Sequence, residues 1–106
     1  MNALNLSDDD FNLIIQLIKT HLPDAIIWAY GSRVKGKSHI GSDLDVVVLN
    51  KTNDTLPSEG LQQLRQALEE SDLPMLIDIH DWAYLPKSFK DEIEKNKVIL
   101  WEPELN

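Results

Sequence analysis

The sequence has no cysteine, few cations and no long apolar run. Without cysteine, a disulfide framework, a thiolate metal site and a cysteine nucleophile are excluded. Only ten basic residues face eighteen acidic ones, and the formal charge of −8 disfavours direct binding to nucleic acid, because phosphate backbones are bound through Lys and Arg. The apolar runs at 25–30 and 46–49 are far too short to span a membrane.

The first ten residues have neither the basic stretch nor the apolar stretch of a signal peptide. Together with the missing cysteine, this predicts a cytoplasmic protein without membrane association. The 106 residues, with 42% hydrophobic and 26% charged side chains, predict one globular domain over residues 1–106. A chain of this length leaves no room for a second, substrate-recognising domain, so a partner is expected to supply that recognition.

Hydrophobic periodicity and turn residues predict three long helices and four strands. The first helix is expected to begin after Ser7, whose hydroxyl can cap the free N–H groups, and to stop at Pro23. Helices are also expected from 58 to about 71 and after Pro86, and strands over 25–30, 43–49, 76–82 and 98–101. This order predicts an α/β fold of the α+β type, with a small mixed sheet of about four strands and helices mainly on one face.

Asp43 and Asp45 stand two residues apart at the start of an expected strand, so both side chains point to the same face, with Cα atoms about 6.5 Å apart. Like charges this close become favourable when divalent cations lie between them, and carboxylate oxygens suit Mg²⁺. An isolated Asp-x-Asp is more often a solvated acidic strand end, so the pair needs further support.

Gly31 and Ser32 end the preceding strand and are followed by three of the ten cations, Arg33, Lys35 and Lys37. A glycine between a strand and a turn lets backbone N–H groups approach a phosphate. The reversal of charge beside this turn favours a triphosphate over a plain basic loop.

A third carboxylate, Asp78, stands in the middle of an apolar strand, where a charge is costly unless it is paired or bound to metal. His80 shares its face, so a zinc site of Asp78 and His80 is an alternative, although no second histidine is placed to help. Asp81 falls on the opposite face and is expected to cap a turn or to face water.

The segment Gly31-Ser32, ten residues and then Asp43-Leu44-Asp45 resembles the signature of the polymerase-beta-type nucleotidyltransferase superfamily. The run through Gly41-Ser42-Asp43, the strand that carries Asp78 and the ending at 98–101 are similar to the minimal nucleotidyltransferases, or MNT proteins. These are paired with HEPN proteins in toxin–antitoxin modules. The resemblance covers nearly the whole chain and implies a nucleotidyltransferase fold.

The resemblance implies that Asp43, Asp45 and Asp78 are catalytic and bind two Mg²⁺ ions, with ATP as substrate. Gly31 and Ser32 would hold the nucleotide phosphates, and Arg33, Lys35 and Ser42 are added as candidate nucleotide-binding residues. The implied reaction is transfer of AMP to a hydroxyl, that of a tyrosine, on a HEPN toxin that forms a hetero-oligomer with this chain.

Two other hypotheses stay open. The chain could be a non-catalytic, nucleotide-binding antitoxin that covers its toxin, since an acidic surface could mimic RNA to a basic ribonuclease site. It could also be a free-standing nucleotidyltransferase that acts on a small alcohol or an RNA end, although the negative charge and the missing second domain disfavour this.

Overall fold

The computed structural model describes residues 4–31, 33–34 and 43–103. Its elements, in chain order, are α1 (Asp8–His21), β1 (Ile26–Tyr30), β2 (Leu44–Leu49), α2 (Leu61–Glu69), β3 (Ile77–Asp81), the 3-10 turn η1 (Trp82–Tyr84), α3 (Lys87–Asn96) and β4 (Val98–Trp101). Within the described residues, no helix combines the length and the apolar character needed to cross a membrane.

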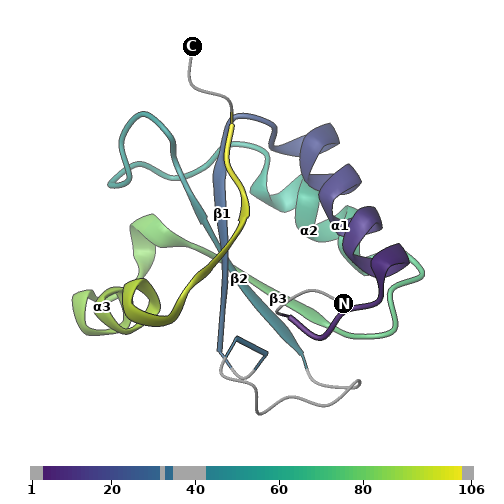
Figure 1. The fold of residues 1–106 in the computed structure, drawn as a ribbon. Coiled ribbons are helices and arrows are strands. Elements are labelled where there is room, and N and C mark those ends of the chain that lie inside the picture. Colours follow the sequence, from purple (N-terminus) through teal and green to yellow (C-terminus); the bar gives the residue numbers. More distant parts are fainter. Residues whose placement is uncertain (1–3, 32, 35–42, 104–106) are drawn as a thin grey trace.

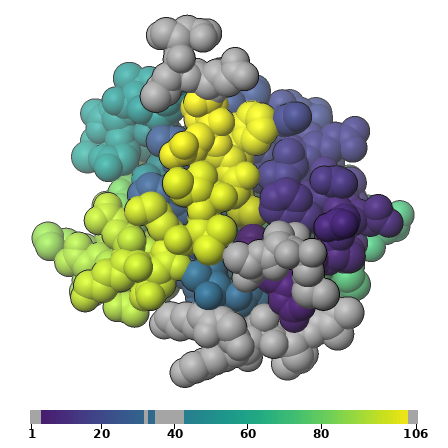
Figure 2. Space-filling model, viewed as in Figure 1, coloured from purple at the N-terminus to yellow at the C-terminus, as the bar shows by residue number. Residues whose placement is uncertain are grey.

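The four strands form one mixed sheet in the order β3-β2-β1-β4 (Figure 1). β1 pairs antiparallel with both β2 and β4, whereas β2 and β3 run parallel. The predicted mixed sheet of four strands is therefore confirmed. β4 is an edge strand that lies at the surface between α1 and α3 (Figure 2).

The two faces of the sheet are covered unequally. α1 and α2 lie together on one face, and α3 lies on the other side of the sheet (Figure 1). The expectation of helices mainly on one face holds for α1 and α2, while Ile93 of α3 packs with Tyr30, Val47 and Trp82 in a smaller cluster on the opposite face. This smaller cover leaves part of that face free for polar side chains.

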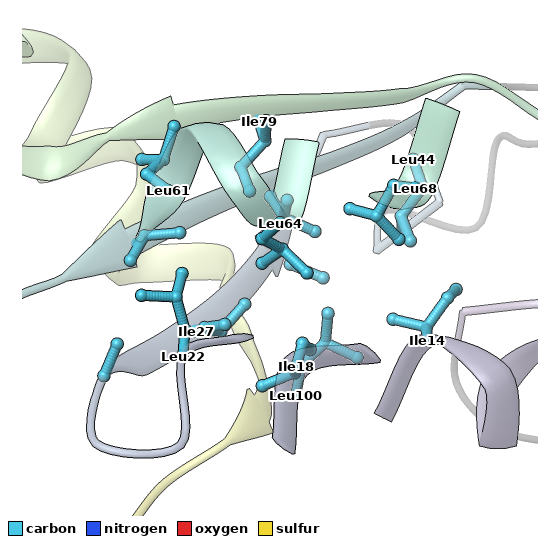
Figure 3. Packing of buried hydrophobic residues seen from close by; sticks show 14 of the residues in the cluster. Ile14, Ile18, Leu22, Ile27, Leu44, Leu61, Leu64, Leu68, Ile79 and Leu100 are labelled. Atoms are coloured by element: carbon cyan, nitrogen blue, oxygen red, sulfur yellow. The ribbon is translucent and has the colours of Figure 1, made fainter. Parts of the chain in front are cut away.

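The larger core lies between the sheet and the two helices α1 and α2. Ile14 and Ile18 of α1 face Leu64 and Leu68 of α2, with Ile27 of the sheet beside them (Figure 3). These side chains are nearly or fully removed from solvent. Alternation along each strand places every second residue in this core and the intervening residues on the α3 face.

Local sequence signals predict the start of α1 correctly but not the start of α2. The Ser7 hydroxyl accepts a hydrogen bond from the Asp10 amide at 3.1 Å, as the capping prediction requires. The prediction that α2 begins at Ser58 is wrong, since the helix begins at Leu61. Gly60 has a left-handed backbone (φ 92°), and the Ser58 amide donates to Asp81 of β3, so the residues before Leu61 follow a tertiary contact and not a helix.

Candidate active site

Two of the three predicted catalytic acids are neighbours across the sheet. Asp45 of β2 and Asp78 of β3 are direct register partners in the parallel ladder, so their side chains project from the same face. Asp43 lies two residues before Asp45, immediately ahead of β2. The structure therefore brings together, from strands more than thirty residues apart in the chain, the acids that the sequence singled out.

The charges of these acids act on one another. The pKa of Asp45 is raised above the usual carboxyl value, first by burial, then by the negative charges of Asp78 and Asp43, and His80 partly offsets this. A raised pKa means that the ionised carboxylate is held in an unfavourable place. A cation between the acids would remove that penalty.

Asp45 and Asp78 form a row across the strands, and Tyr30 of β1 continues this row onto a third strand. It is the antiparallel register partner of Asp45, and its ring packs edge-on against Phe89 of α3, with ring centroids 5.8 Å apart. Burial and the charges of Asp45 and Asp78 raise the pKa of the Tyr30 phenol, so it stays protonated at neutral pH. Sequence reasoning did not count Tyr30 among the site residues, although its place directly before Gly31 was a usable signal.

Gly31 ends β1 in direct contact with the site. Its φ of 83° lies in the left-handed region, and its carbonyl accepts from the Val34 amide at 3.2 Å, which closes a turn. A Cβ atom at this position would overlap the Asp45 carboxylate. The glycine is therefore required both by the backbone conformation and by the closeness of the carboxylate.

Arg33 has a different role from the one expected. Its side chain is only 1% exposed, and Nη1 donates to the carbonyl oxygens of Leu4 (3.0 Å) and Asn5 (2.9 Å). The guanidinium thus anchors the N-terminal segment inside the protein, and the expectation that Arg33 binds a triphosphate is corrected on this ground. The other predicted nucleotide-binding residues, Ser32, Lys35 and Ser42, lie outside the described residues.

His80 and Asp81, the two polar residues that follow Asp78, point to opposite faces of β3, as predicted. His80 lies on the Asp78 face, and its Nε2 is 3.1 Å from Asp78 Oδ2. Asp81 instead accepts from the amides of Ser58 (3.0 Å) and Ala83 (3.4 Å), so the prediction that it caps a turn is confirmed.

The acids fit a hard divalent cation in residue type. Carboxylate oxygens on two adjacent strands are suitable ligands for Mg²⁺, which takes the rest of its shell from water and substrate phosphates. Among the described residues, no group of three or more His, Asp or Glu side chains is already drawn together around a metal position.

A cavity of about 320 Å³ opens beside these acids on the side of the edge strand β3. Asp43 and Asp78 both line it. The rest of its wall comes from the end of α2 and the segment leading into β3, including the apolar side chains of Leu73 and Leu76. Leu76 is 73% exposed, so an apolar side chain stands unprotected next to the charged site.

Comparison with known proteins places this site in a family. Residues 12–104 match the family model described as "Polymerase beta, Nucleotidyltransferase". The chain is 34% identical over 101 residues to the probable protein adenylyltransferase MntA of Haemophilus influenzae, and the match covers 95% of this chain and 87% of that protein.

Two solved structures of toxin–antitoxin complexes have a similar fold. The crystal structure of a toxin–antitoxin with AMP-PNP superposes with a TM-score of 0.67 at 28% identity, covering 89% of this chain and 74% of that chain. The crystal structure of the toxin–antitoxin MntA-HepT gives a TM-score of 0.61 at 25% identity, covering 91% and 73%. The chain therefore belongs to the polymerase beta nucleotidyltransferase family, as its Gly-Ser and Asp-x-Asp segments predicted.

Proposed function

We propose that this chain is an antitoxin that transfers AMP from ATP to a hydroxyl, most simply that of a tyrosine, on a partner HEPN toxin and so inactivates it. The observation that carries the proposal is the pairing of Asp45 with Asp78, with Gly31 against the Asp45 carboxylate. The likeness to a protein adenylyltransferase and to a toxin–antitoxin with AMP-PNP supports the same substrate and the same kind of partner.

Asp43, Asp45 and Asp78 would hold two Mg²⁺ ions. When bound, the metal polarises the phosphate oxygens and neutralises the charge that develops during phosphoryl transfer. The pKa of Asp45 is raised by burial and then by the charges of Asp78 and Asp43, and this supports the assignment, because a bound cation would offset both causes.

The reaction is an in-line displacement at the α-phosphorus of ATP. The acceptor hydroxyl oxygen forms a bond to the α-phosphorus, the bond from that phosphorus to the oxygen bridging to the β-phosphorus breaks, and pyrophosphate leaves. Asp78 takes the proton of the acceptor hydroxyl. The chain itself contributes positioning and charge, which supply most of the catalysis in phosphoryl transfer.

The phosphates would lie at the end of β1. Gly31 begins a turn with a left-handed backbone beside the Asp45 carboxylate, and Ser32 follows it directly. Lys35 and Ser42 remain proposed nucleotide-binding residues. Arg33 is left out of this set because its guanidinium is buried on the N-terminal segment.

The strand order suggests the direction from which the acceptor arrives. Gly31 directly after β1, Asp45 on β2 and Asp78 on β3 follow one another in the order of the strands. An in-line displacement needs the nucleophile opposite the leaving group. With pyrophosphate leaving toward β1, the acceptor enters from the β3 side, where the cavity lined by Asp43 and Asp78 opens.

The reaction needs a protein acceptor, so we propose that residues 1–106 act as one nucleotidyltransferase domain in a hetero-oligomer with the toxin. No direct role for nucleic acid or membrane is required. The cytoplasm, where ATP is available to both partners, is the proposed location.

The test is incubation of the purified chain with ATP, Mg²⁺ and its toxin partner, followed by mass spectrometry of the toxin. The expected result is a mass gain of one AMP unit or a whole multiple of it, lost in the Asp45→Asn variant. A toxin that gains no mass from active protein would contradict the proposal.

The net charge of −8 favours one second candidate function, in which the chain neutralises the toxin by binding alone. The Asp45→Asn variant separates the two. If this variant protects cells from the toxin as well as the wild-type chain does, binding is sufficient and AMP transfer is dispensable.

A further inference from the structure

His80 makes a direct contact with the third acid of the site. Its Nε2 lies 3.1 Å from Asp78 Oδ2, and both belong to β3, two residues apart and on the same face. The backbone of each is fixed by the parallel ladder, because Asp78 pairs with Asp45 and His80 pairs with Val47. The imidazole is therefore held next to the carboxylate by the strand itself.

This contact is poorly explained as a stabilising ion pair. The side chains of His80 and Asp78 are 42% and 57% exposed. Ion pairs as exposed to solvent as this one contribute little to stability. Neither residue belongs to either hydrophobic cluster, so packing does not explain the histidine either.

We propose that His80 is a positioning residue for Asp78. The Nε2–H group donates to Asp78 Oδ2, which fixes the rotation of the carboxylate and leaves its other oxygen available to the shared cation site. A neutral imidazole with its proton on Nε2 is sufficient for this role, so no change of protonation is involved. The inference rests on the proposed function, because it assumes that Asp78 binds the metal.

The positioning role of His80 follows from the different surroundings of Asp45 and Asp78. Asp45 is restricted on one side by Gly31, because its carboxylate lies where a Cβ atom of that residue would be. Asp78 stands on an edge strand and is more exposed, so an outside contact is needed to restrict it. Hydrogen-bond partners of metal ligands act in this way in many metal sites.

The role is also distinct from that of a zinc ligand. In that case Nε2 would face a metal shared with Asp78 and could not donate a hydrogen bond to the carboxylate. A donor that is not a metal ligand can be replaced by another donor. Glutamine carries an amide N–H₂ group at a similar reach and cannot stand in for an imidazole as a strong zinc ligand.

The experiment measures Mn²⁺ binding to the full chain by electron paramagnetic resonance, in the presence of AMP-PNP, for the wild type, His80→Ala and His80→Gln. His21→Gln, in the last turn of α1, is the matched control. We expect His80→Ala to weaken Mn²⁺ binding about tenfold. His80→Gln and His21→Gln should stay close to the wild type, and the thermal midpoints of all four proteins should agree.

Equal Mn²⁺ affinity in His80→Ala and the wild type would overturn the inference, and so would an equal loss in His80→Gln and His80→Ala. AMP transfer to the toxin is measured separately on the same proteins. A tenfold loss in His80→Ala that is rescued in His80→Gln, without any AMP transfer by the wild type, would support the role of His80 and contradict the proposed acceptor reaction.

Discussion

Replacing Gly31 by alanine should separate the stability of this fold from the function of its site. The residue has a φ of 83°, and an added Cβ would overlap Asp45 Oδ2. The first effect acts on the backbone and the second on the carboxylate. We expect Gly31→Ala to be moderately destabilised and severely impaired in metal binding and AMP transfer.

The stability cost follows from the left-handed backbone, which costs an L-residue about 1–2 kcal/mol. For a domain of 60–100 residues, each kcal/mol lowers the melting temperature by about 4–8 °C. The overlap adds little to this cost, because a carboxylate can rotate away. That rotation moves Asp45 off the row it shares with Asp78, and a displacement of about 1 Å at a reacting centre can cost a factor of about 100 in rate.

Gly60 provides a matched control. Its φ is 92°, and an added Cβ would lie 2.9 Å from the His21 carbonyl oxygen and 3.0 Å from Leu22 Cδ2. Gly60→Ala therefore carries the same conformational cost plus a backbone clash, at the opposite end of β1 from the site. It should lose at least as much stability as Gly31→Ala, with wild-type metal affinity while folded.

The assay combines urea unfolding, which gives the free energy of unfolding, with Mn²⁺ affinity and mass spectrometry of the toxin, all below the melting temperature of both variants. The reasoning is refuted if Gly31→Ala keeps wild-type Mn²⁺ affinity and AMP transfer. It is equally refuted if Gly60→Ala loses both while it remains folded.

Three further predictions concern the row of acids, the buried arginine and the cavity. The pKa of Asp45 is raised in the folded protein by burial and then by Asp78 and Asp43. Asp45 therefore contributes most to the stability of the folded protein at low pH, where it is protonated, and this contribution is lost as the pH rises through the folded pKa and the carboxyl ionises. In the absence of divalent cations, Asp45→Asn should therefore melt higher than the wild type at pH 7, and the gap should close below about pH 4; a constant gap would contradict the cause given. Arg33→Met should lower the free energy of unfolding by about 2 kcal/mol or more, since two backbone carbonyls lose a charged donor, and urea unfolding measures this. An unchanged stability with a raised KM for ATP would return Arg33 to the phosphate site. Leu76→Arg should raise the KM for the toxin and leave AMP-PNP affinity unchanged, because Leu76 lines the cavity on the proposed acceptor side; calorimetry and initial rates distinguish this from weaker nucleotide binding.

The elements that could be predicted from the sequence are those set by local interactions. The start of α1 depends on Ser7 and an amide three residues away, so the capping pattern locates it. The start of α2 depends on the contact of Ser58 with Asp81, across 23 residues, and no local pattern reveals it. Arg33 was misassigned for the same reason, because its partners lie 28 and 29 residues earlier in the chain.

The candidate site shows the same division. Alternation alone puts Asp43 and Asp45 on one face of a strand. That Asp78 lies beside them depends on the parallel pairing of β2 with β3, which spacing does not reveal and which only the family resemblance suggested. The sequence predicted that His80 shares the face of Asp78, but the 3.1 Å distance between them and the pairing of Tyr30 with Asp45 required the structure.

β2 contributes one face to the larger core and the other face to the site, so the packing of the core determines where the acids lie. In β2, Leu44, Val46 and Val48 are almost fully buried against α1 and α2, while Asp45 points to the other face. A shift of β2 by one residue would turn the charged Asp45 into the core beneath α1 and α2, so the hydrophobic core penalises a loss of register. The position of Asp45 opposite Asp78 is thus held by apolar burial on the far face and not by favourable contacts at the site, where the acids repel one another. The larger core and the acids of the site thus lie on opposite faces of the sheet, and neutralising Asp45 should strengthen the fold while it removes a ligand that the proposed metal site needs.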